Sequence, residues 1–488
     1  MTEPSKATGF PNARLTESGT AVVKDKRSVP GALGGASFSE RAMRGFAGTV
    51  LARPWFDRAT LLGLKHGFFP ASRLWAAARD ASSDTDRFFA AVPLPVRHEI
   101  KPKLSLALAR FEEARAAANA IEAEWQRTFF GKQEISADYC RAVEGARLRL
   151  RHGYNATRWQ FRRLLRGAVP RVKLNVETPE AVEAIHGGGR DAFVARCAPP
   201  SAIPPVEVSR ILELASQRDY WLRFPSPHAR IGDTVYARVH EPLDAIDPPT
   251  VIFGHGICVE YDHWKGLIDE SRALVAKGFR VIKPEAPWHG RRVYPGSFGG
   301  EHTIATFPMG MLDSFSAAVQ EWSVLADWAR RYSSAPLVFG GSSLGAMASQ
   351  FAATCSTLWR QDLRPDALFL ITHTGDMAAA VMEGALATMW ASPEEIERKG
   401  WTRELTRQFL SLVNPVGALP MPARQVVSIL GRRDTVLPFE SGRQLVASWG
   451  VPQENAFVWD RGHFSVPPTL IRTTAPIDRL AEIVQSIS

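Results

Sequence analysis

The stretch that most constrains the fold of this chain is residues 337–347. It opens with the apolar run Leu-Val-Phe, which is typical of a buried strand, and it closes on residues that begin a helical pattern. Between the two lies Gly-Ser-Ser-Leu-Gly, a G-x-S-x-G pattern centred on Ser343. A strand, a sharp turn and a helix in this order hold the central serine in a strained conformation, with its hydroxyl exposed above the sheet. The pattern makes Ser343 a candidate nucleophile, the alternative being an ordinary Gly-rich turn.

Two further candidates follow strand-like runs downstream. Asp434 comes shortly after the apolar run at 426–430, and His463 comes after the run at 457–459. The carboxyl ends of parallel strands meet at one edge of a sheet, which is where ligands bind. Free serine is a weak nucleophile at neutral pH and needs a base within hydrogen-bond reach. We therefore expect His463 to take the Ser343 proton and Asp434 to hold the correct tautomer of the imidazole.

Other interpretations of these positions remain open at this stage. Asp434 is also compatible with a turn residue or the partner of a neighbouring arginine, and His463 with a plain loop residue. Asp376 follows another strand-like run and is a rival for the acid. Asp460 lies so near the histidine in sequence that it fits a local turn better. Ser342 is the other hydroxyl of the pattern, but the spacing of the two glycines selects its neighbour.

The order Ser, Asp, His, each after a strand-like run, resembles that of the α/β-hydrolase superfamily. The apolar run at 251–253 leads into Gly-His-Gly-Ile, which is similar to the oxyanion loop of that superfamily. The resemblance covers residues from about 225 to 488. It implies that the backbone N–H groups of Ile257 and Leu344 form the oxyanion hole, while His255 and Gly256 shape the loop.

A second loop carries candidate pocket residues. Residues 286–292 read Ala-Pro-Trp-His-Gly-Arg-Arg, and a similar Pro-x-His-Gly-x-Arg loop occurs in several members of the superfamily. The resemblance implies that His289 and Arg291 lie beside the pocket, mainly in a structural role, although an arginine there is also suited to an acidic substrate. His373, after a different strand-like run, is a further candidate to face the pocket.

The chain is long enough for more than one unit. At 488 residues, it has a Pro-rich stretch at 196–206 that marks a plausible boundary. We expect a flexible arm over residues 1–40, a mainly helical region over 41–205, and an α/β-hydrolase catalytic domain over 206–488 with a mostly parallel sheet flanked by helices. The helical pattern over 377–415 predicts a small cap, the alternative being an ordinary connection with an enlarged loop.

The helical region before residue 205 contains an Arg-rich segment at 137–165, which we expect to be interrupted at Gly153 and Asn155. A basic helix beside aromatic residues suits phosphate or a membrane surface. The competing interpretation is a solvated face, or arginines paired with acids such as Glu144. Because this region is rich in aromatic residues, we predict that it packs over the carboxyl ends of the strands and shapes the pocket, rather than forming a separate module.

Composition narrows the classes of partner and location. With 45% hydrophobic and 22% charged residues the chain is typical of globular proteins, and its formal net charge of +9 fits a solvated surface better than a nucleic-acid partner. The 4 scattered cysteines match neither a disulfide framework nor a zinc pattern, and the histidines show no metal-ligand spacing. We therefore expect no cofactor, no metal, no signal peptide, no transmembrane segment and a cytoplasmic location.

These observations predict a serine hydrolase that cleaves a carboxylic ester, or a related acyl bond, of a small molecule through an acyl-enzyme. Amide or carbon–carbon bond hydrolysis on the same three residues is an alternative, because the fold supports both. A non-catalytic binding protein that keeps the fold is a further alternative from a different class.

Overall fold

The computed structural model describes residues 22–23, 53–92, 99–165, 172, 174–259, 270–390 and 393–487. The arm predicted over residues 1–40 lies outside the described residues, apart from Val22–Val23. The described ranges include the sheet, its flanking helices and every residue proposed above for the site.

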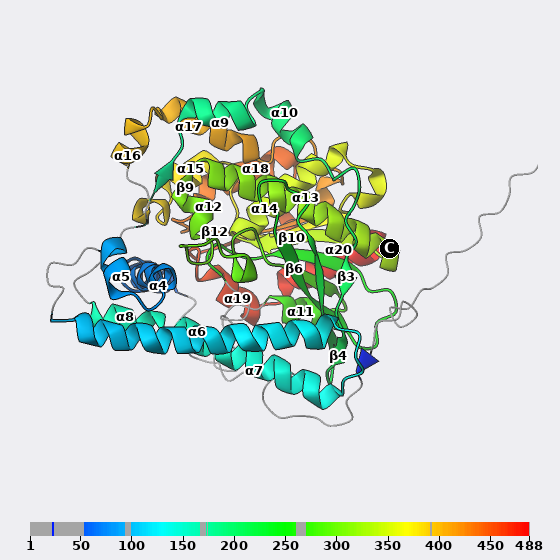
Figure 1. The fold of residues 1–488 in the computed structure, drawn as a ribbon. Coiled ribbons are helices and arrows are strands. Elements are labelled where there is room, and N and C mark those ends of the chain that lie inside the picture. Colours follow the sequence, from blue (N-terminus) through cyan, green and yellow to red (C-terminus); the bar gives the residue numbers. More distant parts are fainter. Residues whose placement is uncertain are drawn as a thin grey trace, which may run out of the picture.

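One mixed sheet forms the centre of the described structure (Figure 1). Its strands are β1 (Val22–Val23), β3 (Glu207–Val208), β4 (Ile211–Glu213), β5 (Gln217–Pro225), β6 (Thr234–Pro242), β7 (Thr250–Gly254), β8 (Arg280–Pro284), β10 (Leu337–Ser342), β11 (Ala367–Ile371), β12 (Val426–Gly431) and β13 (Ala456–Trp459). The main order is β1-β4-β5-β6-β8-β7-β10-β11-β12-β13, and β3 pairs with β5. Strand β6 runs antiparallel to both of its neighbours, whereas all pairs from β8 to β13 are parallel.

Helices cover both faces of this sheet, so the predicted fold class of a mostly parallel sheet flanked by helices is confirmed. One face carries α13 (Met309–Tyr332) and α14 (Leu344–Cys355), and the other carries α11 (Ser271–Ala276), α19 (Val466–Arg472) and α20 (Ala475–Ile487). On β10, Phe339 packs into the first core and Val338 into the second, because successive side chains of a strand point to opposite faces. Strands buried on both faces read as the continuous apolar runs seen in the sequence.

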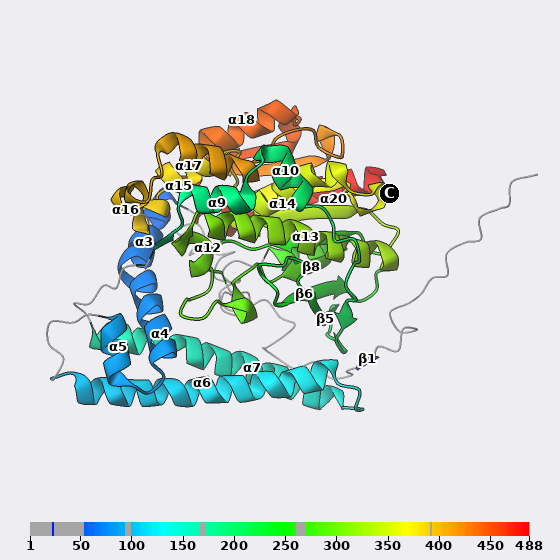
Figure 2. The same ribbon diagram turned by 45° about the horizontal axis from the view of Figure 1, so that its top comes forward.

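The helices after β11 lie over one end of the sheet. These are α15 (Met377–Glu383), α16 (Pro393–Arg398) and α17 (Arg403–Leu410), while α18 (Phe439–Trp449) follows β12. They are joined there by α12 (Glu301–Ala305) and by the short parallel pair of β2 (Asn175–Val176) and β9 (Thr306–Phe307). In Figure 2, α15, α16 and α17 lie close together, next to the first described helix of the chain.

The region before the sheet is mainly helical. Its helices are α3 (Pro54–Gly63), α4 (Phe69–Ala81), α5 (Thr85–Ala91), α6 (Lys101–Phe130), α7 (Ala137–Ala156), α8 (Arg158–Leu164), α9 (Pro179–His186) and α10 (Gly189–Arg196), with a π-helical stretch at Leu64–Phe68 between α3 and α4. Figure 2 shows α3 and α4 running from the level of α6 and α7 up to α16. Helices α6 and α7 lie side by side along the opposite edge of the molecule.

The predicted break of the Arg-rich segment at Gly153 and Asn155 is wrong by a few residues. Helix α7 continues through both and ends at Ala156. The Thr157 hydroxyl, at the junction with α8, donates a 2.6 Å hydrogen bond to the carbonyl of Tyr154. A Cβ on Gly153 would meet nothing within 4 Å, so the glycine sits on an open helix face and does not interrupt it.

Helices α6 and α7 pack against the antiparallel side of the sheet. Trp125 of α6 meets Trp221 of β5 edge to face, with ring centroids 5.4 Å apart. Arg147 of α7 is buried, donates to Glu144 at 2.9 Å, and lies 5.1 Å from the centre of the Trp125 ring. For this arginine, the interpretation as a partner of nearby acids therefore holds.

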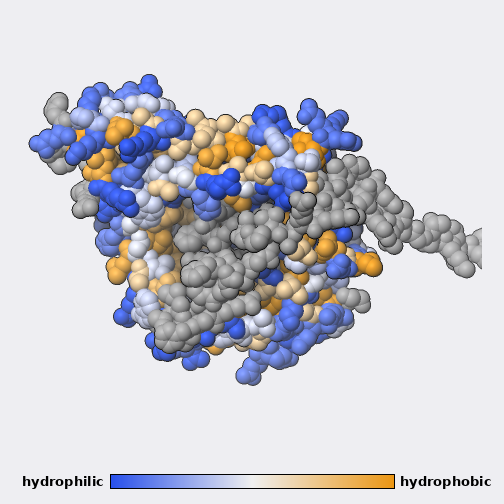
Figure 3. All heavy atoms as spheres, turned by 90° about the horizontal axis from the view of Figure 1, so that it is seen from below, coloured by the Kyte–Doolittle hydropathy of each residue, from blue (hydrophilic) through white to orange (hydrophobic). Residues whose placement is uncertain are grey.

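Seen from below, the described part of the molecule has hydrophilic residues interspersed with small hydrophobic groups (Figure 3). Leu106 of α6 and Trp159 of α8 are among the exposed large hydrophobic residues. None of the helices in the described ranges, the 30-residue α6 included, is both long and apolar enough to cross a membrane.

Candidate active site

Ser343 stands at the turn between β10 and α14 with φ 55° and ψ −119°, a conformation that non-glycine residues rarely adopt. The surrounding structure requires the two glycines of the pattern. A Cβ on Gly345 would lie 2.1 Å from the backbone of Gly254 on β7, and a Cβ on Gly341 would lie 2.4 Å from the carbonyl carbon of Gly345. Strand and helix approach closely only because these side chains are missing, and this approach leaves Ser343 at the apex of a strained turn.

The three residues proposed as a triad form one hydrogen-bonded chain. His463 Nε2 lies 3.0 Å from Ser343 Oγ, and His463 Nδ1 lies 2.7 Å from Asp434 Oδ2. The other carboxylate oxygen of Asp434 accepts hydrogen bonds from the N–H groups of Val436 and Leu437 at 2.8 and 2.9 Å. A carboxylate held in this way accepts a hydrogen bond from Nδ1–H, which keeps the proton on Nδ1 and leaves Nε2 free to accept from the serine hydroxyl.

The rival residues have other partners. Asp376 caps α15, and its Oδ1 accepts from the N–H groups of Ala378 and Ala379. Asp460 forms an exposed pair with Arg433, whose Nε lies 2.6 Å away. Ser342 is the last residue of β10 and is paired in register with β11. The structure therefore brings together Ser343, His463 and Asp434 and leaves the alternatives outside this chain of bonds.

The two backbone donors expected for the oxyanion hole flank Ser343. Leu344 is the first residue of α14, and Ile257 lies in the loop after β7; both line the same cavity as Ser343. Neither N–H has an acceptor within the part of the chain that the structure describes. The loop passes close to the nucleophile at Gly256, where a Cβ would sit 3.6 Å from Ser343 Cβ, an ordinary van der Waals contact. Donors of this kind can stabilise an oxyanion without reorganisation.

Two histidines hydrogen-bond the backbone of the loop after β7 and of the loop beside it. His289 Nε2 accepts the N–H of Cys258 at 3.1 Å, and its Nδ1 donates to the carbonyl of Pro287 at 2.9 Å. Burial, assisted by the neighbouring His255, lowers the pKa of His289 to about 3, so Nε2 remains an acceptor at neutral pH. His255 Nε2 accepts the N–H of Ala286 at 3.1 Å. These contacts fit the structural role expected for the second loop.

Neither Arg291 nor His373 lines the cavity in front of Ser343. The contacts of Arg291 fit the structural role expected for its loop and not the alternative of binding an acidic substrate, whereas His373 was expected to face the pocket and does not. Arg291 pairs with Glu285 and Glu122, and it stacks 4.5 Å from the centre of the Trp221 ring, on the side facing α6. Its charge is thus compensated within the protein and is turned away from an incoming substrate. His373 points into the sheet, where its Nε2 lies 2.8 Å from Ser428 Oγ of β12. Burial lowers the pKa of His373 to about 3.

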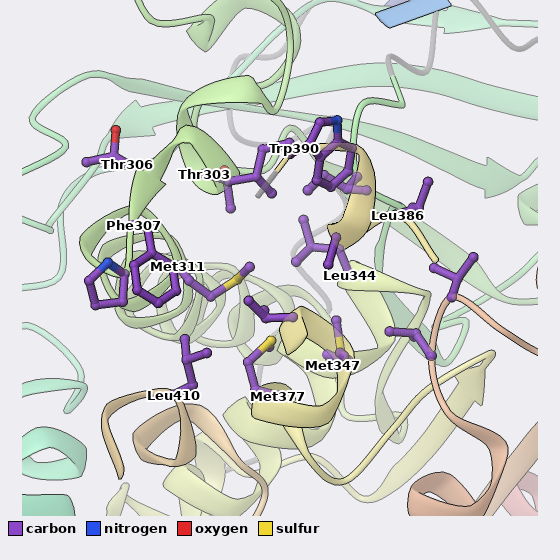
Figure 4. Close-up of a pocket in the computed structure, with 18 of the residues that line it drawn as sticks. Thr303, Thr306, Phe307, Met311, Leu344, Met347, Met377, Leu386, Trp390 and Leu410 are labelled. Carbon is purple, nitrogen blue, oxygen red and sulfur yellow. The ribbon is translucent and has the colours of Figure 1, made fainter. Parts of the chain in front are cut away.

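The cavity in front of Ser343 has a volume of about 100 Å³ and apolar walls. Figure 4 shows its side chains converging from several elements, with Met311 from α13, Met347 from α14 and Met377 from α15. None of its described lining residues is charged. The hydroxyl of Thr303 is buried in this wall without a hydrogen-bond partner among the described residues, so it is available to a bound molecule.

The N-terminal helices contact this site, which sequence reasoning anticipated only in general terms. Leu174, from the region before residue 205, lines the cavity. Phe69 of α4 packs edge to face on the cavity residue Trp390, with ring centroids 5.0 Å apart. Asp57 of α3 accepts hydrogen bonds from the two residues after His463. The role of Asp57 could not be predicted from the sequence, because a single aspartate in a helical segment is typical of a solvated charge.

Among the described residues, no group of three or more His, Cys, Asp or Glu side chains is arranged to hold a metal ion. The groups that the site presents are the serine hydroxyl, the imidazole, the carboxylate and the backbone donors described above. This set is sufficient for acyl transfer.

No protein-family model and no curated protein matches the sequence. Solved structures to which the chain is similar are titled as esterases or lipases. A cold-adapted esterase from an Arctic intertidal metagenomic library is 18% identical, with 56% of this chain and 96% of that chain covered and a TM-score of 0.37.

Two other solved structures give similar values. Acetyl xylan esterase 1 from Thermoanaerobacterium sp. is 16% identical, with 60% of this chain and 93% of that chain covered and a TM-score of 0.42. A hyperthermophilic esterase from the archaeon Pyrobaculum calidifontis is 16% identical, with 61% of this chain and 89% of that chain covered and a TM-score of 0.36. At this level of similarity, the function of the chain has to be inferred from its own site geometry.

Proposed function

We propose that this protein is a serine hydrolase of the α/β-hydrolase type that cleaves carboxylic esters carrying a short, apolar acyl group. The observation that carries the proposal is the hydrogen-bonded chain from Ser343 through His463 to Asp434, which opens onto an apolar cavity. Three groups in this order activate a serine hydroxyl and return its proton to a leaving group.

In the proposed reaction, the substrate carbonyl lies above Ser343 with its oxygen toward the N–H groups of Ile257 and Leu344. His463 removes the serine proton as Oγ attacks the carbonyl carbon, and Asp434 stabilises the resulting imidazolium. Collapse of the tetrahedral intermediate breaks the ester bond, and His463 gives its proton to the departing alcohol. Water then attacks the acyl-enzyme by the same route and releases the acid.

The walls of the cavity support an apolar, uncharged acyl group. A carboxylate or ammonium placed among Met311, Met347 and Met377 would lose its hydration without gaining a partner. The volume of about 100 Å³ is smaller than an enclosed cavity of roughly 150 Å³ that holds benzene, which supports an acyl group whose buried part is short. The free hydroxyl of Thr303 is suited to an oxygen atom on the substrate.

The helices after β11 act in this proposal as a small cap. Met377 and Ala380 of α15 and Leu410 of α17 contribute to the wall of the cavity that Ser343 lines. A wall from an inserted segment excludes bulk water from the acyl group and sets the length of chain that fits.

A series of p-nitrophenyl esters from acetate to palmitate tests the proposal, measured on the wild type, Ser343→Ala and the matched control Ser342→Ala. We expect the highest kcat/KM on the short esters, a loss of about 10³-fold or more in Ser343→Ala, and a small change in Ser342→Ala. Normal turnover in Ser343→Ala would exclude the serine mechanism. Labelling of the wild type by a fluorophosphonate is also expected, and its absence would favour a non-catalytic binding protein.

A further inference from the structure

We propose that Asp57 of helix α3 is a positioning residue for His463, so that the N-terminal helix completes the catalytic machinery of the sheet domain. This inference rests on the proposed function, because it assigns a role toward the same imidazole. Asp57 contacts neither the serine nor a place for the substrate, and it would act through the backbone on either side of the histidine.

The carboxylate of Asp57 holds the histidine loop at two points. Its Oδ1 accepts the N–H of Phe464 at 2.6 Å, and its Oδ2 accepts the hydroxyl of Ser465 at 2.6 Å. The Ser465 Oγ in turn accepts the N–H of Gly462 at 2.9 Å. One carboxylate, reached across 407 positions of sequence, therefore fixes the backbone directly before and directly after His463.

The loop is shaped to receive this carboxylate. A Cβ on Gly462 would lie 2.4 Å from Cγ of Asp57 and 2.5 Å from its Oδ1, so any larger residue there would displace the acid. Asp57 is only 7% exposed, although aspartate is rarely buried without partners. Trp55 and Leu62 of the same helix remain 49% and 59% exposed. The helix thus buries its acid against the histidine loop while two of its large apolar residues face outward.

The site needs such a restraint because the histidine has two partners to satisfy at once. Its ring has to stay near 3.0 Å from Ser343 Oγ and 2.7 Å from Asp434 Oδ2 through both half-reactions. It is carried by a loop that follows β13, and a loop position is held less precisely than one on a strand or helix. A displacement of about 1 Å from the reactive geometry can cost roughly 10²-fold in rate.

A merely structural role for Asp57, as an anchor that holds α3 on the sheet domain, makes a different prediction. Loss of an anchor would lower the melting temperature and leave the turnover of the folded enzyme unchanged. Loss of a positioning residue would lower kcat and the rate of fluorophosphonate labelling, since both depend on the serine–histidine contact, and would change KM little.

The test compares Asp57→Ala and Asp57→Asn with Asp84→Ala in the full chain. Asp84 is a suitable control because it caps α5 through the N–H groups of Asp86 and Arg87, so its loss also removes a carboxylate that accepts two hydrogen bonds in the N-terminal helices. Each protein is measured for kcat and KM on a p-nitrophenyl ester, for the second-order rate of fluorophosphonate labelling, and for melting temperature.

We expect kcat and the labelling rate of Asp57→Ala to fall about 10- to 10²-fold with KM within about twofold. Asp57→Asn should recover part of the loss, because its amide oxygen still accepts the N–H of Phe464. Asp84→Ala should lower the melting temperature and keep both rates.

Unchanged kcat and labelling in Asp57→Ala, with labelled wild type, would overturn the positioning role and leave the proposed function standing. An equal loss of both rates in Asp84→Ala would also overturn it, because the effect would then follow general destabilisation. A wild type that is not labelled at Ser343 would overturn the proposed function, and the positioning role with it.

Discussion

Helices α3 and α4 and helices α6 and α7 precede the same sheet, yet they contact opposite sides of it. Asp57 of α3 meets the histidine loop, and Phe69 of α4 supports Trp390 in the cavity wall. Trp125 of α6 and Arg147 of α7 instead pack against β5, on the antiparallel side. The N-terminal helical region therefore has two halves that are adjacent in sequence. Helices α3 and α4 contact the candidate site, and helices α6 and α7 form a scaffold against the sheet.

The contacts of the two halves differ in chemistry as well as in place. Helices α3 and α4 reach the site through the separate side chains Asp57 and Phe69, and Arg73 of α4 also pairs with Glu301 of α12 at 2.6 Å. Helices α6 and α7 form a layered contact of aromatic rings and guanidinium groups, in which Arg147 lies 5.6 Å from the centre of the Trp221 ring. We therefore expect changes in the first pair of helices to alter catalysis, and changes in the second pair to alter stability.

The largest effect is expected at the proposed triad, which lies on the side of the sheet that helices α3 and α4 contact. Asp434→Asn should lower kcat by about 10⁴-fold at neutral pH, because an amide in this position favours the wrong tautomer of His463. Asp376→Asn is the matched control and should be mild, since that residue caps α15. If Asp376→Asn proves the more damaging change in kcat, the acid lies after β11 and the triad assigned here is wrong.

The next largest effect concerns the free energy of unfolding, and we expect it in helices α6 and α7. Trp125 is fully buried between α6 and β5, and its replacement by alanine should lower the free energy of unfolding by about 3–5 kcal/mol. Urea unfolding measures this change. Assayed under conditions where it is folded, the variant should keep the wild-type order of preference over acyl-chain lengths. An altered order would show that α6 also shapes the cavity.

A change in α4 should alter the preference for acyl-chain length, which the change in α6 is expected to leave unchanged. Phe69→Ala removes the ring that backs Trp390, so the tryptophan gains room to retreat and the cavity lengthens. We expect longer esters to gain about tenfold in kcat/KM relative to short ones, a difference that one or two methylene groups in an apolar pocket commonly produce. The p-nitrophenyl ester series used for the wild type measures this ratio, and an unchanged ratio would place Phe69 with the scaffold.

The smallest effect is a pH dependence of stability that differs between His373, a buried residue of the sheet, and Glu122 of the α6–α7 half. Burial lowers the pKa of His373 to about 3, so the folded protein excludes a proton that the unfolded chain binds below about pH 6.5. The stability from this group is complete above pH 6.5 and is lost as pH falls toward 3. Glu122 of α6 behaves differently: burial raises the pKa of its carboxyl, but Arg291 and Arg147 outweigh burial, and the net pKa lies below 4.5. Its contribution is lost only below that pH.

Urea unfolding at several pH values between 6.5 and 4.5 tests this difference. His373→Gln should reduce the fall in unfolding free energy over this interval, whereas Glu122→Gln should leave its slope unchanged. Equal slopes in wild type and His373→Gln would show that the buried histidine does not govern the pH response.

The site residues that could be predicted from the sequence are those that lie within a few residues of a strand end. Gly341, Ser343 and Gly345 stand in one turn, and the close approach of backbones that requires the glycines is a local event. His463 and Asp434 were identifiable for the same reason, since each follows an apolar run. The mostly parallel sheet also follows from the buried runs, because most of them are largely apolar and do not alternate with polar residues.

The parts that sequence did not predict depend on long-range packing. His373 follows a strand, like the triad residues, but its side chain turns into the sheet toward Ser428. Arg291 stands in the expected loop, but α6 supplies Glu122 as a partner from far away in sequence. Asp57 shows the same limit most clearly, because its partners lie near the other end of the chain.

An acyl-enzyme on Ser343 can be detected through the mass of the protein during turnover of a slowly hydrolysed ester. The wild type, quenched in acid and digested, should carry the acyl group of that ester on the peptide containing Ser343, and fragmentation should place it on that residue. Ser343→Ala should carry none, and Asp57→Ala should acquire it more slowly. An acyl group on Ser342, or turnover with no covalent adduct in the wild type, would contradict the account.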